Sequence, residues 1–283
     1  MMPFTHRLAP LLVLACLAML PAQTRAGFGN EQFEDDPSKP QEELDWPEVS
    51  FPTAKERGVG FRAGERLEYR AQWGFFRKAG KIVIETKEVN SKIQVSTATA
   101  SAGLIRRIYP MTLNATSTID PRQWRMEKNE VNGKTRSKLN QTNTHIDYET
   151  DQIVFENKVE PERSKISDLP YDVPLDYASS LLQLRGYDLK VGQAYPIFVT
   201  SKGKFYYIEM SVAEIESRKT DLGQRDCFRL EPTKAFPRSK LFKEGGNMSI
   251  WITNDDQRIP VRFDVKTSVG TASIRLEKYE AGE

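Results

Sequence analysis

The chain has 283 residues, of which 39% are apolar and 28% are charged, with 41 basic and 39 acidic residues. A mean hydropathy of −0.56 excludes a membrane protein with many spans. An aromatic content of 10% excludes a chain that is disordered throughout.

The first 26 residues have the pattern of an export signal. Arg7 precedes an apolar run at 8–20, and small residues at 24 and 26 predict cleavage after Ala26. The run is shorter than the roughly 20 residues that a spanning helix needs, so we expect no transmembrane span after cleavage. The alternatives are a retained anchor and a lipid attached at Cys16, although the apolar run continues past Cys16. The protein is therefore expected to be periplasmic or otherwise extracytoplasmic.

Residues 27–57 are typical of an acidic, proline-rich, disordered tail. Residues 27–54 contain eight acidic residues and one basic residue, whereas residues 55–283 contain 31 acidic and 38 basic residues. Such a tail buries too little apolar surface to offset the entropy of ordering it. Its aromatic residues leave the alternative that short pieces dock on a partner or on the rest of the chain. We also expect the tail to fold back weakly onto the basic domain and to compete there with an anionic ligand.

Residues 58–283 are predicted to form a single antiparallel β domain. Apolar and polar residues alternate in many short runs, as in Leu67, Tyr69, Ala71 and Trp73, which share one face of a half-buried strand. The runs cover 65–73, 81–89, 92–100, 112–119, 124–131, 138–148, 152–159, 194–200, 204–215, 225–231, 248–252, 259–267 and 271–279. Short turn-rich links favour antiparallel neighbours. About a dozen strands should then curl into a clam-like open or half barrel.

One short helix is predicted near residues 176–186, between the two groups of strands. Asp176 is a suitable N-cap, and Gly186 is a suitable stop. Tyr177, Leu181 and Leu184 form an apolar stripe at helical spacing. A helix of about three turns is unstable alone, so we expect it to pack on one face or end of the sheet.

Several runs of residues together resemble a known family. They are the sequence GERLEY at 64–69 with Trp73 and Ala79-Gly80, the Leu184-Arg185 end of the helix, and the hairpin at 250–261. These resemble the exported bacterial family catalogued as domain of unknown function 3108, over about residues 64–279. The resemblance implies an all-β extracytoplasmic domain and supplies no catalytic residues. The hairpin alone also looks like one in periplasmic lipoprotein carriers of the LolA and LolB kind.

The residues that usually carry catalysis or bind metals are scarce. After cleavage Cys227 and His145 remain, so no internal disulfide forms, and a His/Cys metal site or a nucleophile with a histidine base lacks partners. We interpret Cys227 as a small buried residue, His145 as a residue of the sheet surface, and Asp255-Asp256 as a turn. We expect no cofactor, no metal and no enzymatic activity. Nucleic acid is also an unsuitable partner, because no basic-aromatic recognition motif is present.

Two groups of residues are candidate binding sites. Trp73, Phe75, Phe76 and Trp251 line a groove for an acyl chain if the sheet forms a half barrel, and otherwise fill the core. A basic loop could contact an anionic partner, or simply be a solvated hairpin. Its residues are Lys234, Arg238, Lys240 and Lys243.

The sequence therefore predicts a monomeric, exported, non-catalytic protein of the cell envelope. The preferred hypothesis is binding of an apolar or lipid-like ligand, or of a lipidated partner. The alternative is a structural or adaptor protein of an envelope complex with a filled core. A hydrolase that uses two carboxylates is the third hypothesis.

Overall fold

A computed structural model of the protein describes residues 45–51, 53–237, 248–267 and 270–282. Within these residues, fourteen strands form one antiparallel sheet. The strands are β1 (Arg66–Trp73), β2 (Phe76–Val89), β3 (Lys92–Ser101), β4 (Met111–Asp120), β5 (Arg125–Thr135), β6 (Lys138–Asp147), β7 (Gln152–Asn157), β8 (Lys165–Asp168), β9 (Ala194–Ser201), β10 (Lys204–Thr220), β11 (Gly223–Phe236), β12 (Met248–Thr253), β13 (Pro260–Thr267) and β14 (Gly270–Glu280). The helices are α2 (Ala54–Gly58), α3 (Gly103–Ile108), α4 (Tyr177–Leu184) and the 3-10 helix η2 (Pro161–Arg163).

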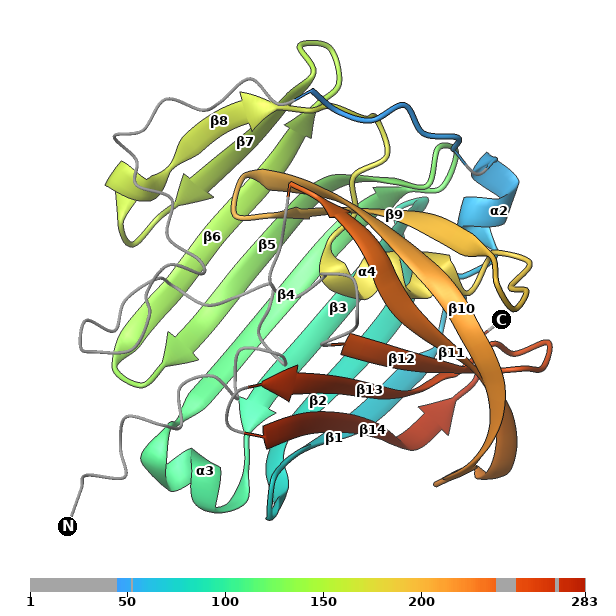
Figure 1. Ribbon diagram of the computed structural model, residues 1–283. Coiled ribbons are helices and arrows are strands. Elements are labelled where there is room, and N and C mark those ends of the chain that lie inside the picture. Colours follow the sequence, from blue (N-terminus) through green and yellow to red (C-terminus); the bar gives the residue numbers. More distant parts are fainter. Residues whose placement is uncertain (1–44, 52, 238–247, 268–269, 283) are drawn as a thin grey trace.

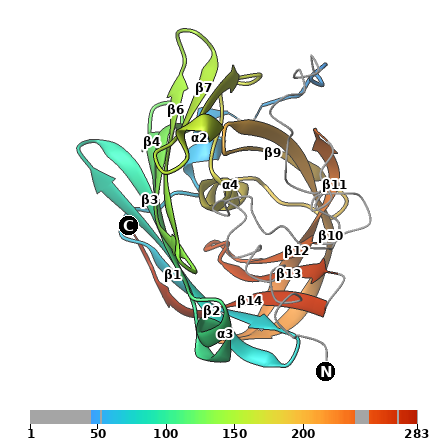
Figure 2. The same ribbon diagram turned by 90° about the vertical axis from the view of Figure 1, so that its left-hand side faces the viewer.

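The sheet consists of two meanders that join in its middle. Strands β1 to β8 are neighbours in chain order, strands β9 to β14 likewise, and β1 pairs with β14. The two edges, β8 and β9, do not pair with each other, so the sheet curls without closing into a barrel (Figure 1 and Figure 2). The prediction of an open, curled antiparallel meander is confirmed.

Helix α4 lies inside the curl of the sheet (Figure 2). The carboxylate of Asp176 accepts hydrogen bonds from two backbone N–H groups of the first turn, at 2.8 and 3.3 Å. Leu182 packs in the larger core cluster, and Leu181 and Leu184 pack in the second one. The predicted helix, its acidic N-cap and its position against the sheet are therefore confirmed, and its apolar side chains join the two halves of the core.

A buried ion pair connects the end of α4 to the middle of the sheet. Arg185 donates two hydrogen bonds to the carboxylate of Glu65, at 2.7 and 2.8 Å, and both side chains are at most 1% exposed. Arg185 also donates to the carbonyl of Gln257 at 3.3 Å. The Tyr279 hydroxyl on β14 donates to Glu65 at 3.1 Å. The carboxylate of Glu65, the residue before β1, thus binds both the helix end and the last strand.

The segment before β1 packs closely on the domain. Residues 45–51 are extended and lie along one end of the sheet, and α2 follows them (Figure 1). A Cβ atom on Gly60 would lie 1.8 Å from the carbonyl oxygen of Leu182, so only glycine allows this approach to α4. The predicted tail, residues 27–57, was interpreted as disordered, with docking on the domain as the alternative. The described parts, 45–51 and 53–57, are docked, whereas residues 27–44 and 52 lie outside the described residues.

Four elements were not predicted, and each is short. Helix α3 has six residues and no side-chain cap, α2 has five residues, β8 has four and the 3-10 helix η2 has three. Elements of this length contain too few residues for a helical or alternating period to be recognised. The sheet also has fourteen strands where about a dozen were expected, and β10 runs on to Thr220, beyond the predicted end at residue 215.

We expect the Glu65–Arg185 pair to be essential for stability. Arg185→Met leaves a buried carboxylate without its cation, which should lower the free energy of unfolding by about 3–5 kcal/mol. Glu65→Gln should cost a similar amount. The double variant should cost less than the sum of the two, because it leaves neither charge unpaired. Chemical denaturation of the four proteins measures this coupling.

The matched control is Lys190→Ala, which removes an exposed partner of Asp188. It should leave the denaturation midpoint nearly unchanged. If the losses in unfolding free energy of the two single variants were fully additive in the double variant, the role of the pair would be contradicted.

Candidate functional site

Aromatic side chains gather at the end of the sheet where its two edges approach. We call the group the aromatic platform. Its members are Tyr171, Phe198, Phe205, Tyr207 and Phe236. The ring centroids of Phe198 and Tyr207 are 5.8 Å apart, and those of Tyr171 and Phe198 are 5.2 Å apart. Such distances are typical of packed aromatic pairs.

The backbone register of β9 and β10 positions this platform. Phe198 and Tyr207 are directly opposite each other in the antiparallel pair, so their side chains share one face. The two edges of the sheet meet at the turn that follows β9, where the Ser167 hydroxyl donates to the carbonyl of Gly203 at 2.5 Å. Leu175 forms a parallel bridge with Val199 and fixes the outer side of β9. The platform is therefore built on backbone that is held from both sides.

The chain's own residues 45–51, which we call the strap, cover the platform. The Trp46 ring lies 4.8 Å from Phe236, 5.6 Å from Phe205 and 5.7 Å from Tyr171. Phe51 stacks on Phe198 at 5.1 Å. Tyr171 donates a hydrogen bond from its hydroxyl to the carbonyl of Pro47. The strap is held mainly by its two aromatic side chains, and Phe51 is still 41% exposed.

The platform is electrically neutral, and one cation lies beside it. Burial raises the pKa of Tyr171, and burial together with nearby Glu209 raises the pKa of Tyr207, so both phenols stay protonated at neutral pH. The Lys234 ammonium lies 5.8 Å from the Tyr207 ring centre. Of the predicted basic loop, Lys234 is exposed beside the platform, whereas Arg238, Lys240 and Lys243 lie outside the described residues.

The four aromatic residues predicted to line a groove are not brought together. Trp73 is buried against α3, with Phe76 at 6.2 Å, whereas Phe75 is 79% exposed. In the strand register, Trp251 on β12 is opposite Arg262 on β13, which in turn is opposite Arg275 on β14. Trp73 on β1 is opposite Ala272 on the same strand β14. Alternation along β14 sets residues 272 and 275 on opposite faces, so Trp73 and Trp251 point to opposite sides of the sheet. A groove formed by these four residues is therefore not present.

Trp251 belongs to the larger core cluster and lies beneath two cations. It is 4% exposed, and the guanidinium groups of Arg218 and Arg262 lie 4.3 and 5.2 Å from its rings. Its indole N–H donates to Glu216. These contacts explain its burial without a ligand, because the arginines shield the ring from water.

The other residues considered for chemistry have structural surroundings. His145 is exposed on β6, and Cys227 is fully buried. Asp255 accepts hydrogen bonds from the backbone N–H groups of Gln257 and Arg258, both at 3.1 Å, as a turn residue does. Among the described residues, no group of three or more His, Cys, Asp or Glu side chains is arranged to hold a metal ion. No helix within the same residues is long and apolar enough to cross a membrane.

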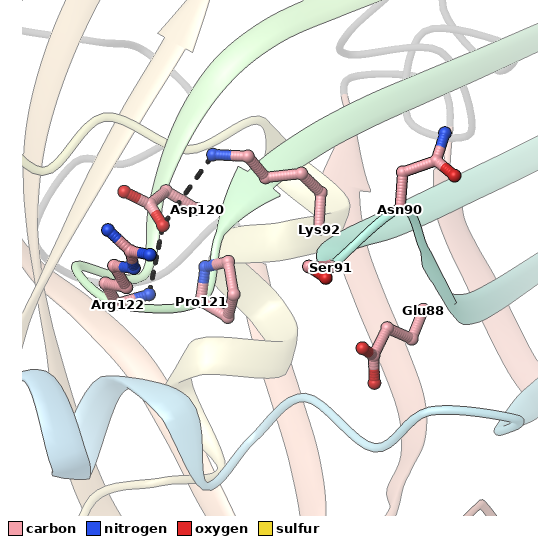
Figure 3. A pocket seen from close by; sticks show the side chains of 7 residues that line it. All are labelled: Glu88, Asn90, Ser91, Lys92, Asp120, Pro121 and Arg122. Carbon is pink, nitrogen blue, oxygen red and sulfur yellow. Dashed lines mark hydrogen bonds and ion pairs between the residues drawn. The ribbon is translucent and has the colours of Figure 1, made fainter.

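A polar pocket of about 400 Å³ lies between the β2–β3 and β4–β5 turns (Figure 3). Its lining residues are Glu88, Asn90, Ser91, Lys92, Asp120, Pro121 and Arg122. The Lys92 ammonium lies 2.6 Å from Glu127 and 3.8 Å from Asp120, so neighbouring carboxylates already neutralise its charge. The pocket offers little for an apolar ligand, and the aromatic platform is the better candidate site.

The family comparison agrees with the resemblance seen in the sequence. The family described as "Protein of unknown function (DUF3108)" matches residues 68–277. The chain belongs to this family. Its expected membership is therefore confirmed. No curated protein matches the chain.

Several solved structures match this chain over most of its length. The beta-barrel-like protein of domain of unknown function DUF1849 from Brucella abortus is 11% identical, with a TM-score of 0.52, and the match covers 79% of this chain and 99% of that one. A candidate lipoprotein from Parabacteroides distasonis is 10% identical, with a TM-score of 0.31, over 78% and 98% of the two chains. A candidate exported protein with a YmcC-like fold from Bacteroides fragilis is 8% identical, with a TM-score of 0.30, over 78% and 97%. The Brucella structure supports the β-barrel-like fold of this chain.

We expect Cys227 to be unreactive in the folded protein. Burial raises the pKa of its thiol from 9.0 to about 11, which lowers the reactive thiolate fraction roughly 100-fold. Iodoacetamide at about pH 8 should therefore label the native chain slowly and the unfolded chain quickly. Because folding raises this pKa, the thiol's contribution to stability is fully present below pH 9.0 and is lost as the pH rises toward about 11. Equally fast labelling of the native and unfolded protein would show that the thiol is accessible.

Proposed function

We propose that this protein is an exported, non-catalytic binding protein of the cell envelope that binds an apolar or lipid-like group at the aromatic platform. Export rests on the signal pattern of residues 1–26. The binding role rests on one observation: the platform is covered by an extended piece of the chain that contributes no strand to the sheet.

The strap contacts the platform in the way that a ligand would. Trp46 makes edge-to-face contacts with three platform rings, and Phe51 stacks on Phe198. Each large aromatic side chain can bury about 150–250 Å² of surface. At about 25 cal/mol per Å², an apolar group that replaced either ring would gain several kcal/mol. Removal of the strap would expose these rings to water.

The surroundings of the platform favour an amphiphile. The phenols of Tyr171 and Tyr207 are neutral, so the rings suit an acyl chain. Lys234, exposed at the margin, could pair with a carboxylate or phosphate head group. A fatty acid, a phospholipid or the acyl chain of a lipidated partner has both parts. Each would displace the strap, or share the platform with it.

A second candidate is an adaptor that binds a protein partner. The interior of the curled sheet is occupied by α4 and by the apolar side chains of two core clusters. The present occupant of the platform is itself a peptide with aromatic side chains. An extended aromatic segment of an envelope protein would then take the place of the strap.

The ligand can be tested with a fluorescent fatty acid such as dansyl-undecanoic acid. The double variant Trp46→Ala/Phe51→Ala removes the side chains that occupy the platform, so it should bind the probe about ten-fold more tightly than the parent chain. Tyr171→Ala should weaken binding by removing a platform ring. Fluorescence titration measures all three affinities, and native mass spectrometry detects lipid that co-purifies.

The matched control is Phe75→Ala, which removes an exposed aromatic ring away from the platform. It should leave probe affinity unchanged. If neither the parent chain nor the strap variant binds the probe or carries lipid, the apolar-ligand proposal is wrong. Capture of an aromatic peptide by the strap variant would then favour the adaptor.

A further inference from the structure

Three chain segments meet at the end of the sheet that carries α3. They are residues 74–80 at the β1–β2 turn, 101–112 around α3, and 132–140 at the β5–β6 turn. The Ala102 N–H donates to the carbonyl of Ala79 at 2.9 Å. The Arg136 N–H donates to the carbonyl of Pro110 at 2.7 Å. We call this surface the α3 end; α3 and the β1–β2 turn lie together at the bottom of Figure 1 and Figure 2.

The α3 end is basic and lacks acidic residues. The three segments contain seven Lys and Arg residues and no Asp or Glu. In the whole chain, by contrast, basic and acidic residues are almost equal, at 41 and 39. The seven residues are Arg77, Lys78, Arg106, Arg107, Lys134, Arg136 and Lys138. On β1, for comparison, Arg66 pairs with Glu68 and Glu85.

Large apolar side chains in the same three segments are exposed. Phe75 is 79% exposed, Leu104 is 52% exposed and Leu139 is 48% exposed. Phe75 is the most exposed of the large apolar side chains that the structure describes. Exposure of this kind costs free energy in water and commonly marks a surface that contacts another apolar phase. Here each apolar side chain has a cationic residue close by in the sequence.

The projecting residues stand on a packed base. Trp73, Ile105 and Met111 are buried together, and Phe76 packs against them. Gly74 and Gly103 have positive φ angles of 49° and 55°, which glycine adopts without strain. The exposed apolar side chains are therefore held facing outward by the buried residues beneath them.

We propose that the α3 end docks on an anionic lipid surface. Cations near such a surface gain about 1 kcal/mol each, and exposed Phe and Leu side chains insert at the boundary between head groups and acyl chains. The three segments carry seven cations and no carboxylate of their own, which suits a negatively charged membrane, and their exposed apolar side chains can insert into it. This site is separate from the aromatic platform, which lies at the other end of the sheet (Figure 1).

Vesicle co-sedimentation tests the proposal. The protein is purified after export, so that the host removes the predicted signal segment. It should bind vesicles of phosphatidylglycerol mixed with phosphatidylcholine, bind phosphatidylcholine alone much more weakly, and dissociate as salt is raised. Phe75→Ser should weaken binding about ten-fold. Arg106→Gln/Arg107→Gln should weaken it about 25-fold, since 1 kcal/mol per cation corresponds to about five-fold each.

The matched controls change exposed residues away from α3. Ile166→Ser on β8 and Arg122→Gln at the β4–β5 turn should bind vesicles as the parent chain does. The strap variant Trp46→Ala/Phe51→Ala should also retain vesicle binding, which separates this proposal from the function proposed above. Equal binding to both kinds of vesicle, or loss of binding in the controls as large as in the α3-end variants, would overturn it. Failure to bind anionic vesicles would overturn it too, and would leave an acidic protein as the partner to test.

Discussion

The buried ion pair between Glu65 and Arg185 is the contact on which the open sheet depends. A closed barrel is held by pairing its first strand with its last, but here the edges β8 and β9 stay unpaired. The curl must therefore be supported from within. Arg185 holds the end of α4 against Glu65, the residue just before β1, and Tyr279 brings β14 to the same carboxylate. Desolvating two charges is costly, and it is tolerated because the two charged groups are paired and further hydrogen-bonded.

The other end of α4 is attached in a similar way. The carboxylate of Asp176 caps the helix and accepts a hydrogen bond from the Ser117 hydroxyl on β4, which in turn accepts one from Asn129 on β5 at 2.8 Å. The Ser180 hydroxyl donates to the carbonyl of Phe198 on β9 at 3.3 Å. The helix thus connects the two meanders. Because it occupies the middle of the curl, the aromatic rings left for binding lie at the end of the sheet.

The distribution of charge gives the two ends of the molecule different characters. The strap contains Asp45 and Glu48 and covers neutral aromatic rings, whereas the segments of the α3 end contain Lys and Arg but no Asp or Glu. The net charge of the whole chain is close to zero, although acidic and basic residues are concentrated in different parts of it. Docking of the α3 end on a membrane would place the aromatic platform on the side away from the lipid. In that orientation the platform stays accessible to soluble or protein-bound ligands.

The amino-acid sequence by itself determined the strands, the meander and helix α4, because alternation and N-capping are local patterns. It also pointed to the family. It could not show that Trp73 and Trp251 face opposite ways, because alternation separates two faces within a strand, and the relation between distant strands depends on register. The platform was missed for the same reason: Tyr171, Phe198 and Phe236 are brought together only by the curl of the sheet. Only the tertiary structure decided that Trp46 and Phe51 cover them, because the packing of an extended segment depends on a surface formed by residues far away in the chain.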